Sequence, residues 1–460
     1  MDNKIEQYFG SMAINKKLVA DLKIRESRTI PSFVEEWLVA KFSDLTEQPI
    51  ETRKKITRFM AEHLPSKNDK EKIKWNLSNG NEMVILDKYS VRTDLKKGIT
   101  FVSIPSLDLV DGLVAEDVIH SCPEILAGGQ WGAGRLRAVS HNKGKAVKLI
   151  EFKPMQSGKI DLEQMVLARQ NFNTSEWIDL LVRTMGCEPS AYNDRQKRYL
   201  ILRLLPMVQN NLNMMELAPK GTGKSFIFSN LSRYVWLNSG GALSEAQLFY
   251  NLSSKQLGLM ATNDVLVLDE GQSIQFKGEN DIHAKFKAYL ESGEFSRGGE
   301  KVTSECGLMI LANIELHNSQ PTRPDYIREL PKMFHDDALL DRFHGIIPGW
   351  EIPRFTKEKI ATGVGLKADA FGEYLHQLRS VSDVEFPYGR IPTLGGDIRD
   401  TKAIERTSSG LSKLLMLNPE DADYEEYVLK PSMELRGMVR RQISFMNPSE
   451  FSPELDITFT

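Results

Sequence analysis

The sequence has little of what marks disulfide-rich, zinc-binding, secreted or membrane-spanning proteins. Its 460 residues contain three cysteines, Cys122, Cys187 and Cys306, which lie far apart and form no Cys-x-x-Cys pair. This spacing fits reduced thiols in a cytoplasm better than a disulfide framework or a zinc site. No stretch approaches the roughly 18 unbroken apolar residues that a membrane-spanning helix needs, and the first residues lack the basic-then-apolar order of a secretory signal. We therefore expect a cytoplasmic protein that does not act in a membrane.

Signatures of several enzyme classes are also missing. The eight histidines are scattered, without a His-Glu-x-x-His motif or a Cys/His cluster, which argues against a metalloenzyme. No Gly-x-Ser-x-Gly turn indicates a hydrolase of that type, and no internal repeat indicates a solenoid or a propeller. With 41% hydrophobic residues, 26% charged residues and a net charge of −3, the composition is that of a globular protein. The length allows two to four domains.

Four segments differ in their patterns. Residues 1–155 show helical periodicity to about residue 75 and then short β runs, which predicts a mixed α/β domain with a small barrel or sandwich. Residues 156–210 contain two bridging helices, one starting near Thr174 and one at Asn193. Residues 211–355 alternate strands and helices, and residues 356–460 are mainly helical. The predicted fold class is therefore α/β, with a mixed N-terminal domain before it and a helical lid after it.

A phosphate-binding loop is indicated in the third segment. It follows a strand-like run at 214–217 and leads into an apolar helix start, which is the context that a P-loop requires. Gly221 and Gly223 would let backbone N–H groups turn toward phosphates. Lys224 would neutralise the β- and γ-phosphates of ATP, and the Ser225 hydroxyl would ligate Mg²⁺. A chance Gly-Lys-Ser in a turn is the alternative. The expected nucleotide-binding residues are Pro219, Lys220, Gly221, Thr222, Gly223, Lys224, Ser225 and Phe226.

Two acidic residues end an apolar run further along the chain. The run at 265–268 predicts a buried parallel strand, and α/β sheets place ligands at the carboxyl ends of such strands. Asp269 would hold Mg²⁺, mostly through water, and Glu270 would act as general base on the attacking water. An ordinary strand ending in solvated acids is the alternative, which the preceding P-loop disfavours.

Two further polar residues fit a nucleotide site. Asn313 follows the apolar run at 308–312 and could orient the lytic water, although asparagine after a strand is also a common turn residue. Arg342 follows an apolar helix end, and its fixed fork of N–H donors suits a finger inserted into a neighbour's ATP site. A surface pair of Asp341 with Arg342 is the alternative.

The order of these motifs resembles the AAA+ ATPase superfamily, and within it the chain resembles the BrxL family, the Lon-like proteins of bacterial BREX phage-defence systems. The resemblance covers most of the chain and rests on residues 128–131, 176–181, 216–225, 292–298, 347–353 and 400–407. It implies a ring-forming ATPase, similar in architecture to minichromosome-maintenance helicases, that encircles and moves along double-stranded DNA. It also implies self-association into a hexamer-like ring or stacked rings, with other BREX proteins as candidate partners. By the same resemblance, Arg342 is the trans-acting finger and Arg406 the lid arginine, with Arg399 as its rival.

Two departures from the family pattern stand out. Ala218 occupies the place of the usual first glycine of the P-loop, which could alter the loop and slow nucleotide exchange. The family usually continues into a Lon-type protease domain, whereas only about forty residues follow the lid helix here, too few for an independent domain. We therefore expect ATPase activity and DNA binding without proteolysis.

Candidate DNA contacts occur in two places. One is a cation-rich stretch whose members include Arg135, Arg137, Lys143 and Lys145. The other is a turn-rich segment before the 308–312 run, where related rings carry a pore hairpin and where Arg297 and Lys301 could grip the DNA backbone. Solvated charges on ordinary strands and loops are the alternative in both places.

Two other functions remain open at this stage. A chaperone-like remodeller would thread polypeptide through the ring, but it usually carries an exposed aromatic in the pore loop, where this chain offers Arg297, Gly298, Gly299 and Lys301. A nucleotide-gated scaffold would lock a ring on DNA without translocation, and nothing in the sequence separates it from a motor.

Overall fold

The structure, a computed structural model, has two compact units. The barrel unit comprises Ser11–Ile160 with Lys367–Glu373, and the sheet unit comprises Met1–Gly10, Asp161–Leu366 and Tyr374–Thr460. The described residues are 1–26, 30–43, 48–66, 68–96, 98–126, 129–141, 144–155, 160–381, 393–394, 397–455 and 458–459.

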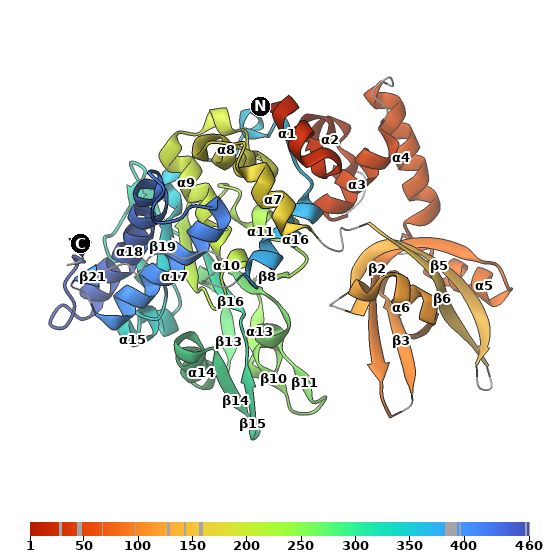
Figure 1. The fold of residues 1–460 in the computed structure, drawn as a ribbon. Coiled ribbons are helices and arrows are strands. Elements are labelled where there is room, and N and C mark those ends of the chain that lie inside the picture. Colours follow the sequence, from red (N-terminus) through yellow and green to blue (C-terminus); the bar gives the residue numbers. More distant parts are fainter. Residues whose placement is uncertain are drawn as a thin grey trace. The chain divides into compact units, whose positions relative to one another are not determined.

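A closed barrel is the centre of the barrel unit (Figure 1). Its strands pair in the order β2-β3-β4-β6-β5, with β5 closing on β2, and β4 runs parallel to β6. The short helix α6 (Glu116–Ser121) lies between β4 and β5 in the chain. This strand order is that of an OB-fold, so the segment that could have been a barrel or a sandwich is a barrel. The strands are β2 (Met83–Asp94), β3 (Ile99–Ile104), β4 (Leu109–Val114), β5 (Gln130–His141) and β6 (Gly144–Pro154).

Glycines in β5 make room for aromatic rings inside the barrel. A Cβ at Gly134 would lie 2.3 Å from the Tyr89 ring, and one at Gly132 would lie 2.5 Å from the Phe152 ring. Tyr89 and Phe152 are buried and meet edge to face, with ring centroids 5.3 Å apart. Large rings opposite small residues thus fill the narrow interior. The helices of this unit before the barrel are α2 (Lys16–Leu22), α3 (Ser32–Phe42), α4 (Pro49–His63) and α5 (Lys70–Ser78).

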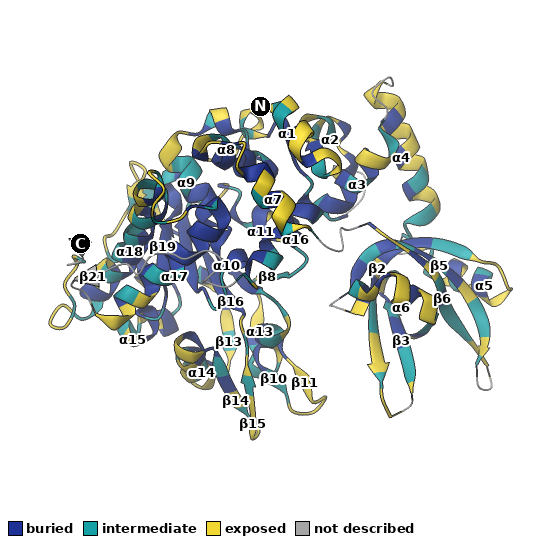
Figure 2. Cartoon of the chain, in the orientation of Figure 1, coloured by how far each residue is buried: buried dark blue, intermediate teal, exposed yellow. Residues whose placement is uncertain are grey.

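A parallel sheet forms the core of the sheet unit. Its strand order is β19-β7-β16-β12-β8, and each neighbouring pair is parallel. The middle strands are buried almost throughout, as Figure 2 shows, because a parallel sheet packs on both faces. The α/β class predicted for this segment is confirmed. The strands are β7 (Met214–Ala218), β8 (Val235–Ser239), β12 (Val265–Asp269), β16 (Gly307–Asn313) and β19 (Gly345–Pro348).

Helices and short strands complete the sheet unit. Two β-hairpins, β10–β11 and β14–β15, extend beyond the sheet in Figure 1. Helix α18 packs on β19 and on α17, while α16 (Ala368–Leu378) belongs in part to each unit. The other helices are α1 (Asp2–Phe9), α7 (Leu162–Arg169), α8 (Thr174–Thr184), α9 (Asp194–Leu202), α10 (Leu205–Val208), α11 (Lys224–Asn230), α12 (Glu245–Leu248), α13 (Leu259–Thr262), α14 (Glu279–Ser292), α15 (Asp337–Leu340), α17 (Ile398–Leu415) and α18 (Lys430–Met446). The hairpin strands are β10 (Tyr250–Asn251), β11 (Gln256–Leu257), β14 (Glu294–Arg297) and β15 (Glu300–Thr303), and a further pair is β9 (Ala242–Ser244) with β13 (Gln275–Lys277).

The two bridging helices begin where the sequence predicts. Asn193 and Gln196 form a capping box at the start of α9, and α8 begins at Thr174 behind a similar box. The second helix is interrupted, because α9 ends at Leu202 and Leu205 already belongs to α10. Pro206 has no N–H to continue the α9 hydrogen-bond ladder, which accounts for the break.

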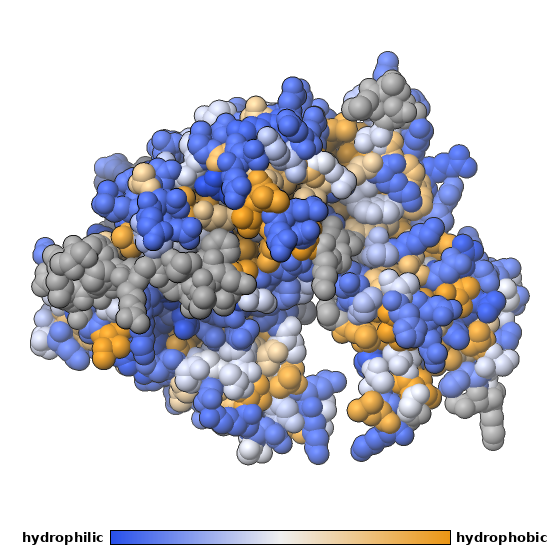
Figure 3. Space-filling view, viewed as in Figure 1, coloured by the Kyte–Doolittle hydropathy of each residue, from blue (hydrophilic) through white to orange (hydrophobic). Residues whose placement is uncertain are grey.

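Within the described residues, no helix is both long and apolar enough to cross a membrane. Hydrophilic residues cover most of the face that Figure 3 shows.

Candidate nucleotide site and arginine cluster

The predicted phosphate-binding loop joins β7 to α11 at the carboxyl edge of the parallel sheet. Gly221 and Gly223 have φ angles of +86° and +78°. A Cβ at Gly221 would meet no atom within 4 Å, so that glycine is needed for its backbone conformation rather than for space. Pro219 and Ser225 are partly buried, while Lys220 and Phe226 are exposed.

Lys224 points at the end of the neighbouring strand. Its Nζ donates a hydrogen bond of 2.6 Å to Oδ1 of Asn313, the last residue of β16. Burial lowers the pKa of the Lys224 ammonium, and the carboxylates of Glu216 and Asp269 oppose that shift. A neutral amide is therefore the direct partner of this lysine, which leaves its charge available to an anion.

The two predicted acids lie at the end of the next strand, β12. Asp269 is its last residue and accepts a 2.9 Å hydrogen bond from the Glu270 N–H. Glu270 is exposed and has a left-handed backbone, with φ of +52°. A non-glycine residue in this conformation costs free energy and is found often at functional sites.

The structure thus brings Lys224, Asn313, Asp269 and Glu270 to one edge of the sheet, because β7, β16 and β12 are parallel neighbours. Sequence reasoning missed Gln272, whose Oε1 accepts a 2.9 Å hydrogen bond from the Asn313 N–H. No motif marks this glutamine, since it reaches Asn313 only through the turn after β12.

Ala218 is accommodated by a glycine that is distant in sequence. It is the fully buried last residue of β7, and a Cβ at Gly349 would lie 2.6 Å from its methyl group. The absence of a side chain at Gly349 leaves room for the alanine. The unusual residue in the loop motif and Gly349 therefore form a complementary pair.

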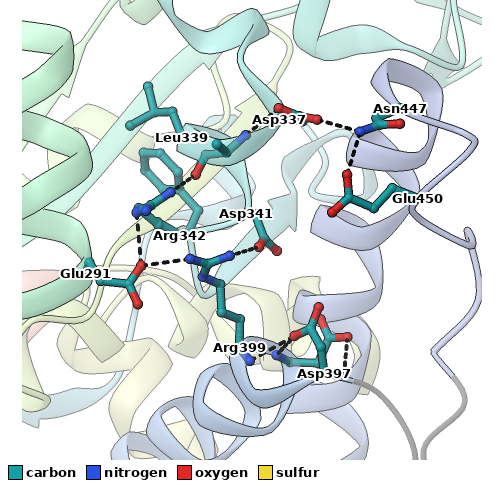
Figure 4. A network of polar contacts seen from close by, with 12 residues as sticks. Glu291, Asp337, Leu339, Asp341, Arg342, Asp397, Arg399, Asn447 and Glu450 are labelled. Atoms are coloured by element: carbon teal, nitrogen blue, oxygen red, sulfur yellow. Dashed lines mark hydrogen bonds and ion pairs between the residues drawn. The ribbon is translucent and has the colours of Figure 1, made fainter.

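The predicted arginines form a separate cluster, of which Figure 4 shows Arg342 and Arg399. Arg342 pairs with Glu291 at 3.0 Å and donates to the Ala338 carbonyl, and Arg399 pairs with Glu291 at 3.2 Å and with Asp341 at 3.0 Å. Arg406 donates to the Asn211 carbonyl at 3.1 Å.

These arginines line a cavity of about 330 Å³. Its lining includes Arg342, Arg399 and Arg406. None of the described residues that line it belongs to the loop at 219–225. The finger candidate and both lid candidates are therefore neighbours of one another.

The candidate DNA-binding residues are mostly engaged in ion pairs or hydrogen bonds. Arg297 ends β14, pairs with Glu245 at 3.1 Å and donates to the Tyr250 carbonyl of the β10–β11 hairpin. Lys301 is exposed on β15 and pairs with Glu294 at 2.7 Å.

The cations of the barrel unit are engaged in a similar way. Arg135 pairs with Glu151 at 2.9 Å, Arg137 pairs with Glu82 at 3.4 Å, and Lys145 donates to the Ser78 carbonyl at 2.6 Å. Lys143 lies outside the described residues.

Comparisons with known proteins identify relatives of the chain. A family model described as "Lon-like protease BrxL-like, ATPase domain" matches residues 147–456, and one described as "BREX system Lon protease-like protein BrxL N-terminal" matches residues 7–137. A "Lon-like protease BrxL" of Escherichia coli O9:H4 (strain HS) is 32% identical over 475 aligned positions, which cover 100% of this chain and 66% of the relative. One of Bacillus cereus (strain H3081.97) is 31% identical, over 99% of this chain and 68% of the relative.

The chain spans 66% and 68% of the lengths of these two curated relatives. Within that span both family models match, and the ATPase-domain match contains the phosphate-binding loop, the two acids and the arginine cluster. The chain therefore belongs to the BrxL family of Lon-like proteins and carries the ATPase domain of that family.

Proposed function

We propose that the chain is a Mg²⁺-dependent AAA+ ATPase that assembles into a ring and moves on double-stranded DNA in BREX-type phage defence. The observation that carries the proposal is the convergence of Lys224, Asn313, Asp269 and Glu270 at the carboxyl edge of one parallel sheet. Counted along the chain, the strands of this sheet have the order 5-1-4-3-2, which places the P-loop strand beside the strand of Asn313.

The residues present fit ATP and Mg²⁺. Lys224 would exchange its hydrogen bond to Asn313 for one to a phosphate, and the freed amide would orient a water molecule. Ser225 and Asp269 would hold Mg²⁺, which supplies charge neutralisation at the phosphate oxygens when bound. Glu270, exposed at the same edge, would accept the proton of the attacking water.

The arginine cluster supports assembly. The cavity lined by Arg342, Arg399 and Arg406 contains no described residue of the P-loop, which supports a role for Arg342 at an ATP site other than its own. In a ring that site belongs to the neighbouring subunit. Arg342 must then leave Glu291, a partly exposed carboxylate whose ion pair contributes little free energy.

Two features support a nucleic acid as the partner. The barrel has the strand order of an OB-fold, and OB-folds commonly bind nucleic acid. The β14–β15 hairpin lies beside the β10–β11 hairpin, since a Cβ at Gly298 would touch the Leu252 side chain. The exposed Lys255 and Lys301 lie on these hairpins and could contact DNA phosphates.

The polypeptide-threading alternative has less support. Phe295 is the aromatic residue of the β14–β15 hairpin, and it is buried against Phe249, with ring centroids 5.1 Å apart. It is therefore not presented as a threading side chain. An ATP-gated scaffold that does not translocate remains the second candidate, because it would use the same residues.

Three assays test the proposal. Lys224→Ala and Glu270→Gln should each lower ATP turnover by about 10²-fold or more. Mixing Arg342→Ala subunits with wild type should lower activity below the wild-type fraction, because each variant subunit disables its neighbour. Wild type should bind a labelled DNA duplex with an affinity that falls steeply with salt. ATP turnover that neither substitution affects would refute the site, and absent duplex binding at low salt would favour a remodeller.

ATP-driven displacement of a roadblock protein from the duplex separates the motor from the scaffold. A motor displaces the roadblock only when ATP is hydrolysed, so Glu270→Gln should bind the duplex and leave the roadblock in place. Wild type that binds DNA and hydrolyses ATP without displacement would identify the scaffold.

A further inference from the structure

An entirely buried ion pair lies next to the phosphate-binding loop. Arg203 follows the last residue of α9, and Glu216 is in β7, two residues before Ala218. The guanidinium donates to both carboxylate oxygens, from Nε to Oε2 at 2.9 Å and from Nη2 to Oε1 at 2.6 Å. Both side chains have 0% exposure. A buried pair of this kind often adds no net stability over apolar residues, so stability alone does not account for it.

The third donor of Arg203 reaches the phosphate-binding loop itself. Its Nη1 donates to the Thr222 carbonyl at 3.3 Å. In a trans peptide the carbonyl and the following N–H point in opposite directions. A carbonyl held toward Arg203 therefore turns the Gly223 N–H away from Arg203.

The preceding peptide is held in the same way. The Phe355 N–H donates to the Gly221 carbonyl at 2.8 Å. Two successive loop carbonyls, those of Gly221 and Thr222, thus have donors that lie outside the loop. Neither donor depends on a bound nucleotide.

Only an arginine can make all the contacts observed at this position, two to the Glu216 carboxylate and one to the Thr222 carbonyl. Its planar fork binds a carboxylate at two points and still presents another N–H group, whereas a lysine ammonium is a compact point charge. Gly349 closes the other side of Glu216, since a Cβ there would lie 2.7 Å from Oε1. The carboxylate is thereby confined to the orientation that receives the guanidinium.

We propose that Arg203 is a positioning residue for nucleotide binding, which holds the Thr222–Gly223 peptide so that the Gly223 N–H faces the phosphates before ATP arrives. The inference rests on the proposed ATPase function. A loop with fixed N–H groups binds phosphates without a reorganisation cost, and its loss weakens the ground state and the transition state alike. The effect should therefore appear in KM rather than in kcat.

Two variants and one control test the proposal. Arg203→Lys keeps a charge opposite Glu216, and the double variant Arg203→Met with Glu216→Leu removes both charges. Arg379→Lys is the matched control, because Arg379 is also buried and donates to the carbonyls of Pro206, Gln209 and Glu305. We would measure the thermal midpoint, the affinity for a fluorescent ATP analogue, and KM and kcat for ATP.

Both Arg203 variants should raise Kd and KM about 10- to 100-fold, the effect of about one lost hydrogen bond to a charged group, with kcat within about threefold of wild type. Arg379→Lys should change the thermal midpoint but not the affinity. Unchanged affinity in a folded Arg203 variant would overturn the inference, and so would the unfolding of both variants, which would assign the pair to stability alone. A wild type that does not bind ATP would instead overturn the proposed function.

Discussion

Replacing Gly349 with alanine tests the packing on which the phosphate-binding loop depends. The new methyl group would lie 2.6 Å from the Ala218 Cβ, 2.7 Å from Glu216 Oε1 and 3.0 Å from Glu216 Cγ. Real Cβ contacts are longer, and both neighbours are fully buried in β7. The φ angle of Gly349 is outside the left-handed region, so the backbone itself accepts alanine. The effect should therefore be steric and local to β7.

Overpacking of this kind costs about 1–3 kcal/mol. In a domain of about 150–250 residues each kcal/mol lowers the thermal midpoint by about 2–4 °C, so Gly349→Ala should lower it by about 2–12 °C. Since β7 leads directly into the loop, KM for ATP should rise as well. Differential scanning fluorimetry and steady-state ATP hydrolysis would measure the two effects.

A second substitution tests whether the close contact with Ala218 causes the loss of stability. Ala218→Gly in the Gly349→Ala background removes the 2.6 Å contact but leaves the 2.7 Å contact with Glu216. The double variant should therefore recover part of the loss, with a coupling free energy of about 0.5–3 kcal/mol.

The control is Gly437→Ala in α18, where a Cβ would meet only Leu455 at 3.5 Å. Alanine is the better helix former by about 1 kcal/mol, so the midpoint should stay or rise. A Gly349→Ala protein with unchanged midpoint and KM, or strict additivity with Ala218→Gly, would refute the packing argument.

Three further outcomes follow from the site and its surroundings. Glu270→Gln should lower kcat about 10²- to 10⁴-fold while nucleotide affinity stays near that of wild type, and an equal loss of affinity would contradict its role as general base. Glu291→Gln removes the carboxylate that holds Arg342, so it should raise turnover of the assembled protein by up to about fivefold, the equivalent of an exposed ion pair; reduced turnover would contradict this. Burial lowers the pKa of His344 to about 3. The stabilisation from its neutral ring is therefore complete above its ordinary pKa of about 6.5. As pH falls from there toward 3, the unfolded state binds a proton that the folded state does not, so the free energy of unfolding falls by about 1.4 kcal/mol for each pH unit. The thermal midpoint should fall more between pH 7 and pH 5 in wild type than in His344→Asn, and equal slopes would show that His344 is not the responsible group.

Local sequence patterns were sufficient to predict the elements whose functional residues are contiguous in the chain. The loop at 219–225, the apolar run before Asp269 and Glu270, and the capping box at Asn193 each lie within one short stretch of chain, so the positions of β7, β12 and the start of α9 could be predicted. The closed barrel could not be told from a sandwich, because the pairing of β5 with β2 joins residues about fifty apart. The pattern of each strand is the same in either architecture.

The other contacts of the site join residues that are distant in the sequence. Nothing in the amino-acid sequence indicates that Gly349 faces Ala218. The same is true of the hydrogen bond from Arg203 to the Thr222 carbonyl and of the ion pair between Glu291 and Arg342. The predicted pore cation Arg297 is another case, since its carboxylate partner Glu245 lies in a different element. The sequence alone determined which residue types are available for phosphate, metal and water chemistry, and on which strand ends they occur. The tertiary structure decided which of them meet, because hydrogen bonds, ion pairs and close packing depend on distances in space that only the packed sheet and its helices establish.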